Sequence, residues 1–182
     1  MNDLLNVKNV AIYLRKSRDE IGDIHELLKK HEKKLRDFAK TNNFFVKKVY
    51  KEVGSSQSFD ERPEFMRMLK DIQEDNMYEA VLVTEISRLG RGNLTQGGKI
   101  QETFAQNDIL IITPEKVYDL NDATSNFIFG IEHLIGNQEY NAIKRRLNQG
   151  KIEGTRLGNW TNGPPPFPYI YDKNTKSLKV DN

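Results

Sequence analysis

The chain has 182 residues, a formal net charge of +2, 37% apolar and 30% charged residues, and no cysteine. This composition allows one modest core, differs from that of a disordered chain, and excludes disulfides, thiolate metal sites and cysteine nucleophiles. No segment approaches about 18 consecutive apolar residues and the N-terminus lacks a signal-peptide run, so we expect a soluble, intracellular protein without a membrane partner.

The first predicted element is a strand over residues 10–14, which are apolar and partly β-branched, as in a strand buried on both faces. Tyr13, Arg15 and Ser17 follow at spacing two, so an extended chain would point all three the same way. In open α/β sheets ligands bind at the carboxyl ends of strands. Taken alone, these residues favour an ordinary turn serine, and the rest of the chain changes that balance.

A helix is predicted over residues 24–40, because Leu27, His31, Leu35 and Phe38 recur at helical spacing. His31 lies on this apolar stripe. It is interpreted either as a half-buried helix residue or as a group near a reacting phosphate.

A second strand is predicted over residues 44–50, followed by a polar, hydroxyl-rich loop that contains Ser55. The loop ends at Arg62 and Pro63, and proline suits the first position of a helix. A guanidinium directly before that helix can reach an anion at the edge of the sheet. A serine-rich loop on its own is usually only a connection.

A third strand, over residues 79–85, leads into a segment with two arginines, Arg88 and Arg91, that are framed by glycines. Such a pair suits bidentate binding of a phosphodiester, and a solvated turn is the alternative. The segment that follows, Gly92 to Lys99, superficially resembles a triphosphate-binding loop. It is not one, because it lacks the required Gly-Lys-Ser/Thr sequence.

The remaining pattern predicts a helix over residues 94–105, a strand over 108–112 and a short edge strand near 117–120. From Ala123 apolar residues keep helical spacing for about thirty residues, which predicts a long helix packed against a second subunit. The later half of this helix is basic. It is interpreted either as a solvated face or as a helix that lies along DNA phosphates, with contacts from Lys144, Arg145, Lys151 and Arg156. Residues 158–168 are a linker by composition, and residues 169–180 predict a hairpin.

These elements predict a doubly wound α/β fold with a mostly parallel, four- to five-stranded sheet, flanking helices and a long C-terminal helix. The candidate side chains all follow the first three strands. A serine among arginines, without a histidine–acid pair or a nucleophile elbow, favours attack on a phosphodiester over acyl transfer. The three histidines have no metal-site spacing, so we expect neither metal nor cofactor.

Three motifs in this order closely resemble the serine recombinase family of resolvases, invertases and large integrases: residues 13–17, 54–63 and 86–91. The resemblance implies that Ser17 is the nucleophile, forms a 5′-phosphoserine bond and leaves a free 3′-hydroxyl. By the same resemblance Arg15, Arg88 and Arg91 bind and activate the scissile phosphate. In the same way, Arg62 matches the family's arginine before the second helix, Ser55 matches its loop serine, and Tyr13 matches its supporting tyrosine.

The resemblance also implies a domain organisation. Residues 1–122 would be a resolvase-like catalytic domain, 123–157 a helix for dimerisation and DNA approach, and 158–182 a linker and the beginning of a recombinase domain. The implied partners are double-stranded DNA attachment sites and further copies of the chain, as a dimer on each site and a tetramer at synapsis. An accessory directionality factor is left open. A cytoplasmic protein encoded by a bacterium, phage or mobile element is expected.

One residue departs from the family pattern. The family usually has an aspartate directly before the first arginine of the third motif, and this chain has Ser87. A hydroxyl can only hydrogen-bond, so the group that protonates the leaving 3′-oxygen is left open. Two other functions compete: a non-catalytic dimerising DNA-binding regulator with the same fold, and a flavodoxin-like phosphohydrolase. We also expect weak DNA binding by this chain alone, because no recognition helix or zinc module is visible.

Overall fold

A computed structural model of the protein describes residues 7–16, 23–53, 62–75, 77–90 and 94–181. The chain divides into two compact units, residues 1–137 and 138–182. Each unit is described by itself.

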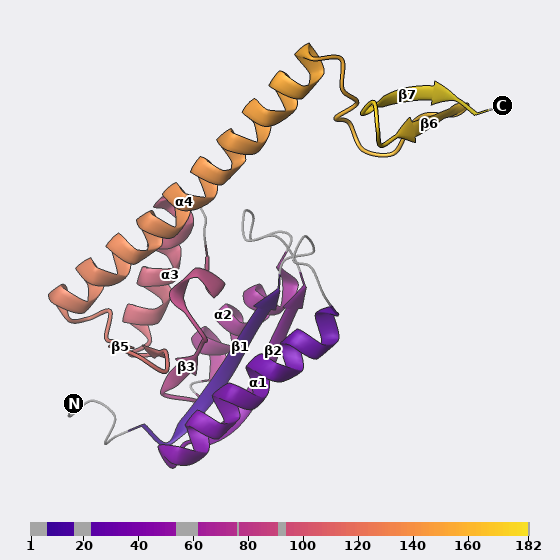
Figure 1. The fold of residues 1–182 in the computed structure, drawn as a ribbon. Coiled ribbons are helices and arrows are strands. Elements are labelled where there is room, and N and C mark those ends of the chain that lie inside the picture. The colour runs from indigo at the N-terminus through magenta and orange to yellow at the C-terminus, as the bar shows by residue number, and fades with distance from the viewer. Residues whose placement is uncertain (1–6, 17–22, 54–61, 76, 91–93, 182) are drawn as a thin grey trace. The chain divides into compact units, whose positions relative to one another are not determined.

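The first unit is built on a five-stranded sheet with the strand order β2-β1-β3-β4-β5 (Figure 1). Its strands are β1 (Asn9–Lys16), β2 (Phe45–Val53), β3 (Ala80–Leu82), β4 (Leu110–Ile112) and β5 (Val117–Tyr118). The first four pair in parallel, and β5 pairs antiparallel with β4. The predicted mostly parallel α/β sheet is therefore confirmed.

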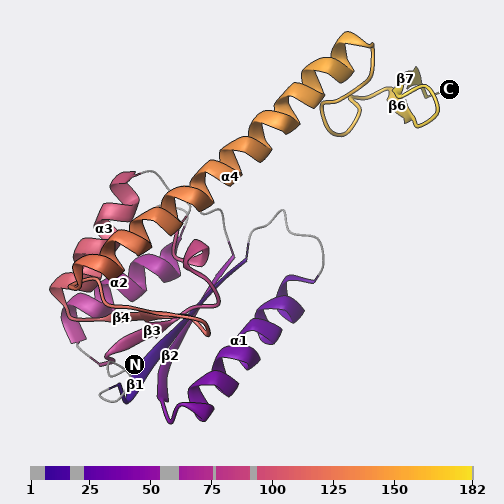
Figure 2. The ribbon, with the colours of Figure 1, turned by 60° about the vertical axis from the view of Figure 1, so that its left-hand side comes forward.

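Helices cover both faces of this sheet (Figure 2). They are α1 (Ile24–Thr41), α2 (Pro63–Asp75), α3 (Leu94–Gln106) and α4 (Ala123–Arg156), of which the part up to residue 137 belongs to the first unit. Alternate residues of β1 point into two cores. Ile12 and Leu14 pack with Leu35 of α1, whereas Tyr13 packs with residues of α2, α3 and α4.

Two strand ends differ from the prediction. β1 continues beyond residue 14, and Arg15 and Lys16 pair with Glu52 and Val53 of a β2 that is longer than expected. Backbone pairing needs no apolar side chains, so the end of the hydrophobic run does not mark the end of the strand. This extension buries Arg15, whose exposed fraction is 2%.

The segment after β3 also differs, because β3 ends at Leu82 and a 3₁₀ turn, η2 (Ile86–Arg88), follows. The N–H of Leu89 donates to the carbonyl of Ile86, and both side chains are buried in the core with Tyr13. Periodicity cannot predict so short a turn, which is fixed by its two buried residues.

The second unit contains the later part of α4 and an antiparallel hairpin of β6 (Tyr169–Asp172) and β7 (Ser177–Val180). These strands lie where the sequence predicts them. The N–H of Trp160 donates to the carbonyl of Lys176, and its indole Nε1 donates to that of Gly163, each at 2.7 Å. The segment between helix and hairpin is therefore held by contacts of its own.

None of the helices described in this chain combines the length and the apolar character that a membrane span requires.

Candidate active site

The carboxyl ends of β1, β2 and β3 lie at one edge of the sheet, because the three strands are parallel. Three arginines meet there: Arg15 at the end of β1, Arg62 directly before α2, and Arg88 at the end of η2. Arg62 is completely buried, and Arg15 almost completely.

Tyr13 and Arg62 form a buried pair beneath this edge of the sheet. Nη2 of Arg62 donates to the Tyr13 hydroxyl at 2.9 Å, and the Arg62 guanidinium lies 3.8 Å from the centroid of the Phe65 ring. Burial raises the pKa of Tyr13 to about 12, although Arg62 acts in the opposite direction. The phenol is therefore protonated near neutral pH and accepts the bond from Arg62.

Glu52, at the end of β2, is a functional candidate that the sequence reasoning missed. Its buried carboxylate accepts the N–H groups of Glu64 at 2.9 Å and Phe65 at 3.1 Å, in the first turn of α2. Burial raises the pKa of Glu52, and these bonds and the charge of Arg62 only partly oppose the shift. A carboxylate at a helix N-terminus is favourable, but only the tertiary structure brings this strand end to that helix.

Arg15 and Arg88 are tied to each other's backbone. Arg15 donates through Nε to the carbonyl of Arg88 at 3.1 Å and through Nη2 to that of Ser87 at 3.0 Å. Nη1 of Arg88 donates to the carbonyl of Arg15 at 3.2 Å. Nη2 of Arg62 also lies 3.4 Å from the Arg88 carbonyl, so the guanidinium groups of Arg15 and Arg62 both contact the backbone of η2.

Of the residues predicted for this site, Tyr13, Arg15, Arg62 and Arg88 are brought together. Ser17, Ser55 and Arg91 lie outside the described residues. His31 is half buried on α1, whose core residues pack on the opposite face of the sheet from Tyr13. In the described ranges no group of three or more His, Asp or Glu residues could hold a metal ion.

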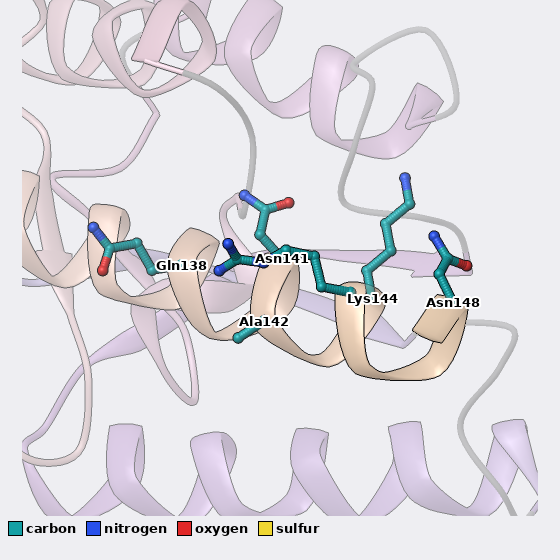
Figure 3. A pocket seen from close by; sticks show the side chains of 6 residues that line it. Gln138, Asn141, Ala142, Lys144 and Asn148 are labelled. Atoms are coloured by element: carbon teal, nitrogen blue, oxygen red, sulfur yellow. The ribbon is translucent and has the colours of Figure 1, made fainter. Parts of the chain in front are cut away.

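The predicted DNA contacts lie in the second unit, on the exposed later part of α4. Asn141, Lys144 and Asn148 project from one side of this helix in Figure 3, where they line a pocket together with Arg145. Helical spacing places Lys151 and Arg156 on the same broad face. Cations and amides of this kind are the usual donors to phosphate oxygens.

The arginine cluster suits an anion with dispersed charge, because planar guanidinium groups bind phosphate oxygens in pairs. Buried guanidinium groups in fixed positions stabilise a phosphoryl transition state without rearrangement.

Comparisons with known proteins agree with this interpretation. The family model described as "Resolvase, N terminal domain" matches residues 10–160. The N-terminal catalytic domain of TP901-1 integrase is similar, with a TM-score of 0.54 and 26% identity, over 77% of this chain and 98% of that one.

Two further solved structures share the fold. A resolvase family site-specific recombinase from Streptococcus pneumoniae has a TM-score of 0.52 and 20% identity, over 82% of this chain and 99% of that one. The C-terminal catalytic domain of ISC1926 TnpA, an IS607-like serine recombinase, has a TM-score of 0.50 and 21% identity, over 70% and 99%.

Proposed function

This chain belongs to the resolvase family of serine recombinases, and we propose that it cleaves and rejoins DNA strands through a covalent bond between Ser17 and a 5′-phosphate. The Ser17 oxygen attacks the scissile phosphorus and the bond to the 3′-oxygen breaks. The 3′-hydroxyl of the partner strand later reverses the step. One bond replaces another of the same kind, so no ATP is consumed.

The observation that supports this chemistry best is the cluster of Arg15, Arg62 and Arg88, of which Arg15 and Arg62 are buried. Arg15 stands two residues before Ser17 in the sequence. Arg15 is fixed at the end of β1 by bonds to two carbonyls. In the proposal Arg15, Arg88 and Arg91 bind the phosphate, Arg62 holds Tyr13, and Ser55 contributes from its loop.

Two further roles are proposed for α4. In the first unit Phe127, Ile131, Leu134 and Ile135 lie on one helical face and are exposed, Phe127 to 69%. An apolar stripe of this kind suits a second copy of the chain. In the second unit the basic face of α4, with Lys144, Arg145, Lys151 and Arg156, would contact DNA phosphates.

The proposal is tested by trapping the adduct. Purified protein is incubated with supercoiled plasmids that carry random inserts, and DNA bound covalently to protein is recovered after denaturation and sequenced. We expect an adduct at Ser17, 5′ ends blocked to a 5′-exonuclease, and free 3′-hydroxyl ends that terminal transferase extends. Ser17→Ala abolishes the adduct while its dimerisation is unchanged.

The rival functions give other results. DNA binding and dimerisation without any adduct favour the non-catalytic regulator. Release of inorganic phosphate from small esters favours the phosphohydrolase. An adduct on a residue other than Ser17 contradicts the proposed nucleophile.

A further inference from the structure

Ser87 stands directly before Arg88, where the family pattern has an aspartate. The Ser87 hydroxyl is buried and makes no hydrogen bond within the described part of the chain, whereas the Ser87 carbonyl accepts a bond from Arg15. Its side chain therefore gives no support to the Arg88 guanidinium there.

A different carboxylate lies against Arg88. Oε1 of Glu85 is 2.9 Å from Nε of Arg88, and the carbonyl of Glu85 accepts the backbone N–H of Arg88 at 3.1 Å. Residues three apart eclipse each other in a 3₁₀ turn, so the backbone of η2 sets the two side chains on one side. The contact is thus a consequence of the turn.

This ion pair contributes little to folding stability. The Glu85 side chain is 50% exposed, and exposed pairs of this kind are weak. Its effect on geometry is larger. Oε1 of Glu85 lies in ion-pair contact with Nε of Arg88, and Nη1 of Arg88 donates to the carbonyl of Arg15, so two contacts act on the plane of the guanidinium. Bidentate phosphate binding depends on that plane.

We propose that Glu85 is a positioning residue that orients Arg88 toward the scissile phosphate, an inference that rests on the proposed strand cleavage. Glu85 acts through Arg88 and does not itself contact the DNA. Ser87 does not orient Arg88 in this chain. Glu85, two residues before Ser87, orients it instead, through the geometry of the 3₁₀ turn.

Adduct formation tests this role, with the DNA site recovered by the trapping experiment. We expect Glu85→Gln to lower the single-turnover rate on the order of 10-fold, and Glu85→Asp to retain most of it. Because Glu85 acts through Arg88, Glu85→Gln has no further effect when combined with Arg88→Lys. Glu102→Gln is the matched control, because Glu102 is exposed on α3 and its carboxylate accepts a bond from Gln106.

Three results would overturn the inference: a wild-type rate in Glu85→Gln, an equal loss with and without Arg88→Lys, or a faster rate. The last would mean that the carboxylate blocks the phosphate site.

A measurement without DNA separates this inference from the proposed function. In ¹H–¹⁵N spectra we expect the Arg88 Nε–H signal to move in Glu85→Gln, which removes the neighbouring negative charge, but not in Glu102→Gln. Wild-type protein that forms no adduct contradicts the proposed function, and the NMR result then decides the inference alone. An Arg88 signal that Glu85→Gln leaves unchanged overturns it.

Discussion

Arg15 and Arg88 are joined by two reciprocal hydrogen bonds, in which each guanidinium donates to the backbone carbonyl of the other residue. The bonds tie the end of β1 to η2 across 73 positions of sequence. Neither arginine is therefore a loose surface cation. The same bonds that fix the backbone also fix the guanidinium groups at the edge of the sheet.

Replacement of either arginine by lysine should cost both stability and activity, because an ammonium cannot reproduce the planar fork. We expect Arg15→Lys to lower the free energy of unfolding by about 1.5–3 kcal/mol and adduct formation by about 100-fold or more. In urea denaturation the double variant with Arg88→Lys should lose less unfolding free energy than the sum of the two single losses.

Arg36→Lys, which alters a half-exposed pair with Glu32, is the control and should change stability by less than about 0.5 kcal/mol. Strict additivity would mean that the two bonds act independently.

Tyr13→Phe removes the acceptor of an Arg62 bond inside the core. We expect a loss on the order of 1–2 kcal/mol in unfolding free energy and slower adduct formation. The pKa of Tyr13 is raised by burial to about 12, above the value near 10 in an unfolded chain. Between those pH values the unfolded state binds fewer protons, so wild-type stability falls as pH rises.

Tyr13→Phe should reduce that alkaline loss by on the order of 2 kcal/mol. Urea denaturation at pH 9 to 12 measures it, with Tyr169→Phe on the exposed hairpin as the control. Parallel stability curves for Tyr13→Phe and the wild type would contradict the buried, protonated phenol.

Glu52→Ala should destabilise the protein more than Glu52→Gln does. Alanine leaves the N–H groups of Glu64 and Phe65 without this acceptor, at a cost of about 1–3 kcal/mol, whereas the glutamine oxygen can still accept. Burial raises the folded-state pKa of Glu52, so protonation at acid pH favours the folded state. The loss caused by Glu52→Gln should therefore be larger near pH 4 than at pH 7. Thermal unfolding at the two pH values measures this, and an opposite trend would show a lowered pKa.

Ile131→Asp tests the apolar face of α4. Because Ile131 is exposed, the charge should leave the unfolding free energy of the monomer nearly unchanged but disrupt a dimer that buries this face. Analytical ultracentrifugation should show a shift from dimer to monomer. Thr124→Asp, on the exposed first turn of the same helix, is the control. A dimer that survives Ile131→Asp places the subunit interface elsewhere.

Lys144→Ala and Lys151→Ala test the basic face of α4. Each lost phosphate contact should reduce the slope of log K against log salt by about 1, for every DNA sequence alike. Fluorescence anisotropy on two unrelated duplexes, at several salt concentrations, gives the slopes. Gln149→Ala is a control on the same helix without a change in charge. A loss confined to one duplex would indicate base contacts instead.

The sequence was enough to predict the main elements and the meeting of four candidate side chains at one edge of the sheet. Short apolar runs and helical stripes both follow from local backbone geometry, so the strands and helices lay close to their predicted positions. Tyr13, Arg15, Arg62 and Arg88 were expected together because they lie near or beyond the carboxyl ends of the first three strands, and they meet at that edge. The end of β1 was predicted too early, since pairing with β2 continues beyond the hydrophobic residues.

Only the tertiary structure decided what surrounds the arginines. Glu52 meets the first turn of α2 through a contact that no periodicity encodes, and Glu85 meets Arg88 in a 3₁₀ turn that the apolar pattern does not predict. Residue types and spacing are properties of the chain and determine which groups reach the edge of the sheet. The partners of those groups depend on where strand ends and turns meet in space, which the packing of the whole sheet sets.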